Sequence, residues 1–306
     1  MSSSTTSLRS GTISRHFSGA GSLAFAVITR RYGTDARRGI TAVTLWGGFA
    51  STVFIPLTQL LLDVSGWRNA LLVLGLCNLA LCVPLHAAVI SPRLDAPPPK
   101  PSGAAAMSSG EALRWVVRRP AFWGLLVAFT VYYGMFVGLT FHLYPMLQEQ
   151  GYAIATIIGA IAIIGPAQVG GRIAMWVLAR EKSVRAIGLV TVAGFPVCLL
   201  LLILLPRTFA TLAAFAFVYG AVNGVTTIVR GLVVPELLTR EAYGSINGLL
   251  ALPANIAKAF APAFTAALWA VQGSYDLVLW AALASSIVVV LAFAFASASA
   301  KRGEAG

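Results

Sequence analysis

The sequence predicts an all-α integral membrane protein with eight full transmembrane helices and one partial helix. Its 306 residues are 58% hydrophobic and only 10% charged, which leaves too little polar surface to cover a water-soluble domain. Each of eight apolar runs has about 20 or more residues, enough at about 1.5 Å per residue to cross a hydrocarbon core of about 30 Å. The runs are 39–62, 70–90, 122–146, 153–178, 186–205, 208–229, 244–270 and 277–296.

The third observation is that positive charge alternates between the gaps that separate these runs. Loops rich in Lys and Arg resist translocation, so the rich gaps and both termini are expected in the cytoplasm of a bacterial inner membrane. The net charge of +12 then reflects topology and attraction to anionic lipids, and nucleic acid is not an expected partner. The rich gaps hold Arg9, Arg15, Arg30, Arg31, Arg37, Arg38, Arg93, Lys100, Arg114, Arg118, Arg119, Arg180, Lys182, Arg185, Arg240, Lys301 and Arg302, and the poor gaps hold Arg68 and Arg207.

Two short segments precede the first full run. Residues 1–18 are rich in Ser and Thr without apolar periodicity, which predicts disorder. Residues 19–29 are apolar but about half as long as a spanning helix, and they end at Arg30 and Arg31. They are either a short interfacial helix or, as we favour, the end of a transmembrane helix whose first half is missing.

The longest polar gap, 91–120, divides the chain into two regions. Its proline-rich part is not expected to be regular, but Ser108 and Glu111 have capping-box spacing before a short amphipathic pattern. We expect a helix lying on the inner membrane surface there. Residues 19–90 then form one region with the partial helix and two spans, and residues 121–300 form a second region with six spans.

Local motifs give the chain a family resemblance. Gly171 and Arg172 near the end of one run, followed by Trp176 and Arg180, look like a degraded glycine, arginine and aspartate loop motif. The run PELLTREAYGSINGLLALPANIAKAFAPAF, residues 235–264, is similar to the eleventh helix of transporters for small carboxylates. With six helices after a central loop, the chain resembles a major facilitator superfamily transporter from about residue 19 to 296, in the oxalate and formate antiporter branch.

This resemblance implies an incomplete major facilitator fold. Residues 19–29 would end the fourth helix, 39–62 and 70–90 would be the fifth and sixth, and helices one to three would be absent. Complete members have twelve helices around a central site formed by inverted repeats. A truncated product, a mis-assigned start and a genuine short form all remain open. The acidic position of the loop motif is not Asp here, so the usual charge relay is not expected.

Lys258 is the strongest candidate for substrate binding. A cation at the centre of a span costs about 2.5–3.5 kcal/mol on insertion scales, so it persists where a partner or an aqueous cavity exists. Asn255 and Asn247 precede it by three and eleven residues and share its helical stripe, which we expect to face a polar cavity. Pro253 and Pro262 free backbone carbonyls and permit a bend.

Other polar residues within the runs are weaker candidates. Arg172 is a second embedded cation, although it lies close enough to a helix end to pin a loop or reach the interface. Arg230 lies near the inner end of its run and is interpreted as an anchor. Four more residues either line the cavity or form hydrogen bonds between helices. They are Gln168, Tyr133, His142 and Asn223.

Embedded cations without deep carboxylates indicate an anionic substrate. All ten acidic residues lie in loops or at helix ends, so coupling would use anion exchange or a proton carrier in the missing helices. We therefore predict a secondary transporter that moves a small organic carboxylate by alternating access, in contact with membrane lipids. The alternatives are a drug or hydrophobic-cation exporter, or a non-transporting remnant or scaffold. Oligomeric state is not indicated.

An enzyme is not expected. The sequence has no P-loop, HExxH or GxSxG motif, and its three cysteines and three histidines are scattered, so we expect no cofactor and no metal.

Overall fold

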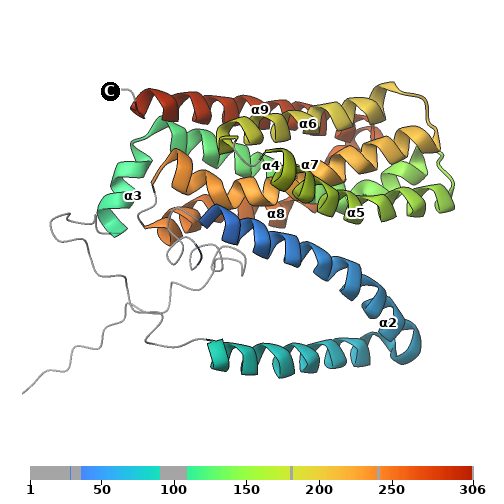
Figure 1. The fold of residues 1–306 in the computed structure, drawn as a ribbon. Helices are drawn as coiled ribbons and strands as arrows, with labels where there is room; N and C mark the ends of the chain where they lie inside the picture. The colour runs from blue at the N-terminus through green and yellow to red at the C-terminus, as the bar shows by residue number, and fades with distance from the viewer. Residues whose placement is uncertain (1–27, 29–35, 90–108, 180–181, 240–241, 305–306) are drawn as a thin grey trace, which may run out of the picture.

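The computed structural model describes residue 28 and residues 36–89, 109–179, 182–239 and 242–304, and the described residues form eight helices and no strands (Figure 1). Seven helical stretches are long and apolar enough to span a membrane. The chain is therefore an integral membrane protein, as predicted. The disorder predicted for 1–18, the partial helix at 19–29 and the proline-rich part of the central loop lie outside the described residues.

The first two predicted spans form a single element, α2 (Ala36–Val89), that reverses direction at one residue. Gly66 has φ 73° and ψ 166°, a conformation that disfavours any residue with a Cβ, so it joins two helical arms without a loop. Figure 1 shows the two arms as a hairpin, with the second arm farther from the other helices. The stretch that qualifies as a span, Leu60–Leu85, crosses this break. The predicted gap at 63–69 is therefore reduced to a turn at one glycine.

A short helix, α3 (Ser109–Val117), leads into the six-helix bundle and matches the predicted amphipathic segment. Its Ala112 and Val116 are buried, while Arg114 is exposed. The guanidinium of Arg119 lies 4.3 Å from the ring centroid of Trp115, which holds the connection to the next helix.

The six remaining predicted spans correspond one to one with helices. α5 packs most extensively on α7, α4 packs on α8 and α9, and α6 packs on α7 and α9. α7 and α8 touch only slightly. Figure 1 shows these helices as one bundle, with the first arm of α2 beside it. The helices are α4 (Pro120–Glu149), α5 (Ile154–Leu178), α6 (Val184–Leu204), α7 (Phe209–Leu237), α8 (Tyr243–Gln272) and α9 (Asp276–Glu304).

Glycines allow α5 and α7 to approach closely. A Cβ added at Gly220 would lie 2.5 Å from the backbone oxygen of Ile164, and one added at Gly171 would meet the backbone of Ala221. A Cβ at Gly224 would meet the backbone of Gln168. These small residues bring the helix backbones into direct contact, which is how helices pack tightly inside a membrane.

Polar contacts tie the ends of α4, α8 and α9 together. Glu149 accepts hydrogen bonds from the indole of Trp269 at 2.8 Å and from the backbone N–H of Tyr275 at 2.7 Å. Burial, and to a lesser extent the Glu149 carboxylate, raises the pKa of Tyr275, so its hydroxyl stays protonated. This hydroxyl shares a hydrogen bond of 2.9 Å with Nδ1 of His142.

Candidate functional site

Lys258 lies at the middle of α8 and is half buried against α4. Its Nζ lies 3.9 Å from the centroid of the Tyr133 ring and donates a hydrogen bond of 3.3 Å to Oδ1 of Asn255. An ammonium over an aromatic face is stabilised by about 0.5–2 kcal/mol, depending on its desolvation. Pro262 has no N–H, so it also removes the usual helical partner of the Lys258 carbonyl. Among the described residues, the groups that hold this cation are neutral.

Arg230, on α7, lies in the same cluster. Its guanidinium carbon is 4.7 Å from the centroid of Phe129, and its NH1 donates to Oδ1 of Asn247. Phe129 and Tyr133 are one turn apart on α4, so the two aromatic rings that face the two cations lie on one side of the same helix. Arg230 therefore joins α7 to α4 and α8, instead of acting only as an anchor at the membrane surface.

Asn247 holds Arg230 against α8. Its side chain is 2% exposed, its oxygen accepts from Arg230, and its Nδ2 is buried with no described partner. It precedes Lys258 by about three turns, and both side chains turn toward the helices that pack on α8.

The cluster is positively charged. Arg230 and Lys258 lie over two aromatic rings one turn apart on α4, and the contacts of both cations in the described part of the chain are to amides and aromatic rings. Two like charges held together in this way repel, and a bound anion would relieve the repulsion. We define the cationic cluster as Phe129, Tyr133, Arg230, Asn247, Asn255 and Lys258.

Arg172 lies in a different interface, between α5 and α7. It is 7% exposed, and its Nε donates to the carbonyl oxygen of Gly224 at 3.2 Å. Its NH1 is buried without a described partner. Because Gly171 and Gly224 bring the two backbones together at this point, the arginine is enclosed by helix packing. The structure thus separates Arg172 from Lys258.

The other predicted site residues make contacts between or along helices. Asn223 is 3% exposed, accepts a hydrogen bond of 2.8 Å from the Tyr132 hydroxyl and donates one of 2.7 Å to the carbonyl of Tyr219. It links α7 to α4 with both functions of its amide satisfied. Gln168 is half buried on α5, with its backbone against Gly224. Their described contacts are with residues outside the cationic cluster.

His142 connects α4 to α8 and α9 away from the cluster. Its Nε2 lies 3.1 Å from the carbonyl oxygen of Pro262, and a carbonyl only accepts, so Nε2 donates. Nδ1 of the neutral ring then accepts from the Tyr275 hydroxyl. Both ring nitrogens are thus used in holding the helix ends together.

Two members of the cluster were not predicted from the sequence, Arg230 as a binding residue and Phe129. Arg230 and Arg172 look alike in sequence, since each lies about two turns before the end of a long apolar helix. Phe129 is one of many aromatic residues in apolar runs. The one sequence signal for Phe129 is its four-residue spacing from Tyr133. This spacing points to a shared site only once Arg230 of α7 is known to lie beside this face of α4.

Comparison with known proteins gives one family. The sequence model described as Major Facilitator Superfamily matches residues 6–205, which extends from the segment before α2 to the end of α6. No curated protein matches the chain. The matched part ends before α7, so the helices that carry Arg230 and Lys258 lie outside it.

Proposed function

Because this chain belongs to the major facilitator superfamily of secondary transporters, we propose that it moves a small organic anion of the carboxylate class by alternating access. One observation carries the choice of an anion: Arg230 on α7 and Lys258 on α8 lie over rings one turn apart on α4, and both contact neutral partners. A site with this charge balance favours a negative solute and disfavours a hydrophobic cation.

The groups of the cationic cluster suit a carboxylate. A guanidinium presents a planar fork of donors that binds two carboxylate oxygens together, and an ammonium adds a mobile point charge. Without the anion, Phe129 and Tyr133 hold the two cations over their ring faces, so the site is arranged before the solute arrives.

Binding at this place would link two helices that otherwise touch little. α7 and α8 pack on each other only slightly, whereas α4 packs extensively on α8. An anion between Arg230 and Lys258 adds an attraction between α7 and α8 that exists only in the loaded state. A ligand shifts a conformational equilibrium by its difference in affinity for the two states, and this contact provides such a difference.

The proposed orientation places both termini and the loops rich in Lys and Arg in the cytoplasm. The outer side then holds the break at Gly66, the α4–α5 and α6–α7 loops, and the contacts of Glu149 with Trp269 and Tyr275. Arg230 lies toward the inner side and Lys258 near mid-membrane, so the cluster extends from the centre of the bilayer inward.

Uptake by proteoliposomes tests the proposal. We expect the chain to take up labelled oxalate or formate, and Lys258→Ala to lower uptake by at least about tenfold, since a charged hydrogen bond contributes about 1.5–3 kcal/mol. Lys258→Arg keeps the charge and should keep most of the uptake. Unchanged uptake in Lys258→Ala would contradict the proposal that the substrate is an anion bound by Lys258. Uptake of tetraphenylphosphonium instead would identify a cation exporter, and no uptake of either solute would identify a non-transporting scaffold.

A further inference from the structure

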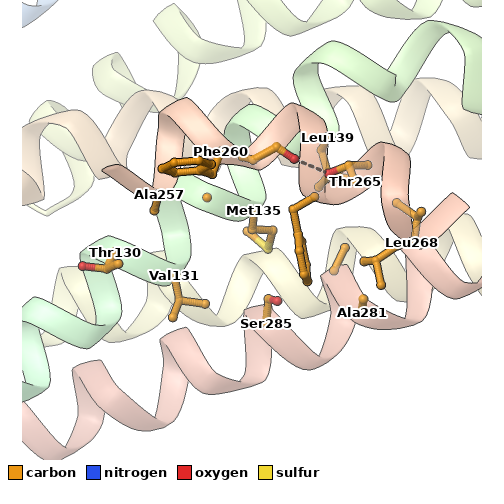
Figure 2. Close-up of a pocket in the computed structure, with 15 residues that line it drawn as sticks. Thr130, Val131, Met135, Leu139, Ala257, Phe260, Thr265, Leu268, Ala281 and Ser285 are labelled. Atoms are coloured by element: carbon orange, nitrogen blue, oxygen red, sulfur yellow. Dashed lines mark hydrogen bonds between the residues drawn. The ribbon is translucent and has the colours of Figure 1, made fainter. Parts of the chain in front are cut away.

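A second cavity lies between α4, α8 and α9, apart from the cationic cluster (Figure 2). Its volume is about 360 Å³, and its walls are mostly carbon. Met135 and Leu139 come from α4, Phe260 and Leu268 from α8, and Ala281 from α9. Apolar cavities of about 150 Å³ already stay free of water and accept apolar molecules, so this cavity has the chemistry of a hydrocarbon site.

A glycine seam separates this cavity from the cationic cluster. A Cβ added at Gly134 would lie 3.6 Å from Cβ of Ala257, and one at Gly138 would lie 2.5 Å from the Thr265 hydroxyl. Tyr133 and Lys258 are each one residue away from this seam, about 100° around their helices, and neither lines the cavity. The cavity therefore faces away from the proposed anion site.

The cavity opens where the protein meets lipid. Its rim residues Phe260 and Phe264 are 69% and 63% exposed, and they continue a stripe of exposed apolar side chains on α8 that includes Leu252 and Ile256. α8 and α9 pack on each other only slightly, which leaves the entrance between them. In a membrane-spanning bundle this exposed surface is in contact with acyl chains, so the cavity is continuous with the lipid-contacting surface.

The length of the cavity along α8 corresponds to the thickness of one leaflet of the hydrocarbon core. From Ala257 to Leu268 its α8 wall rises by about 16 Å, roughly half of a hydrocarbon core of about 30 Å. It runs along the helices from mid-membrane toward the α8–α9 turn. Trp269 and Trp280, both exposed, lie near this end, and tryptophan is enriched at the depth of lipid headgroups.

We infer that the cavity between α4, α8 and α9 binds one acyl chain of a membrane phospholipid, drawn from the leaflet at the α8–α9 turn. The terminal methyl group would lie beside Val131 and Ala257, and the carbons near the glycerol beside Leu268 and Val278. This inference rests on the membrane location of the chain and is independent of the proposed anion transport.

Cross-linking can test the direction in which the acyl chain lies in the cavity. The intact protein would be reconstituted with phosphatidylglycerol that carries a photoreactive diazirine at one defined acyl carbon, and labelled residues would be mapped by mass spectrometry. A diazirine near the glycerol should label Leu268 and Val278, and one near the terminal methyl should label Val131 and Ala257. Labelling spread evenly over the exposed faces of α2, α8 and α9, or labelling in the reverse order, would overturn the inference.

Filling the cavity provides a matched pair of variants. Ala281→Phe should lower labelling of the cavity residues about tenfold, because the ring occupies space that about two methylene groups of the acyl chain would fill. Ala284→Phe places the same ring on an exposed position of α9 and should leave labelling unchanged. Phe264→Ala removes apolar wall surface that the acyl chain would contact, so it should also lower labelling. It adds no side-chain bulk, so it provides the test if Ala281→Phe fails to fold. Unchanged labelling in these cavity variants would overturn the inference.

A competition experiment identifies the source of the hydrocarbon. Excess free fatty acid should not displace the phospholipid label, and displacement would overturn the assignment to a phospholipid.

Discussion

Arg230 and Arg172 are the same residue type at comparable places in two helices that differ in their neighbours. Arg230 contacts Phe129 on α4 and Asn247 on α8, and its own helix α7 touches α8 only slightly. Arg172 donates to the carbonyl of Gly224 where α5 and α7 pack most closely. An embedded arginine thus becomes a candidate ligand where it lies near a second cation among neutral side chains, and a packing element where it bonds to the backbone of a closely packed helix.

Replacing each arginine with methionine should separate the two roles. We expect Arg230→Met to weaken the apparent affinity for the carboxylate by about thirtyfold or more, since removing one member of a charged hydrogen-bonded site costs about 2 kcal/mol or more. Arg172→Met should leave that affinity within about twofold, because its contact is to a backbone carbonyl away from the site. Concentration-dependent uptake measures both, and an equal loss in the two variants would contradict the comparison.

Adding one methyl group to α5 should disrupt its close contact with α7. Gly171→Ala should lower the free energy of unfolding by about 1–3 kcal/mol, because its Cβ would overlap the backbone of Ala221. Gly170→Ala, one residue earlier, has no atom within 4 Å of the new Cβ and should be neutral or slightly stabilising. Thermal unfolding in detergent compares them. If Gly170→Ala were as damaging as Gly171→Ala, close backbone contact would not explain the α5–α7 interface.

The aromatic contact of Lys258 gives the smallest expected effect. Tyr133→Leu removes the ring face and should weaken carboxylate affinity about threefold, the equivalent of about 0.5–1 kcal/mol for a cation over an aromatic ring. Tyr133→Phe keeps the ring and should bind as the unchanged protein does. A loss in Tyr133→Phe equal to that in Tyr133→Leu would show that the hydroxyl matters instead of the ring.

The sequence alone determined the membrane location and most of the helices, because the need to satisfy backbone hydrogen bonds in lipid ties a long apolar run to a helix. All six runs after the central loop are helices, and Gly66 shortens the gap between the first two runs to a turn because glycine adopts a positive φ. The sequence also singled out Lys258 and its stripe with Asn247, since both positions follow from helical periodicity.

Only the tertiary structure decided which helices lie next to these residues. It brought Arg230 from α7 to Asn247 and Phe129, and it enclosed Arg172 against Gly224 on α7. It also formed the apolar cavity between α4, α8 and α9 from residues of three helices that carry no common motif. Periodicity specifies the face of a helix, whereas the partner of that face depends on contacts between residues far apart in the chain.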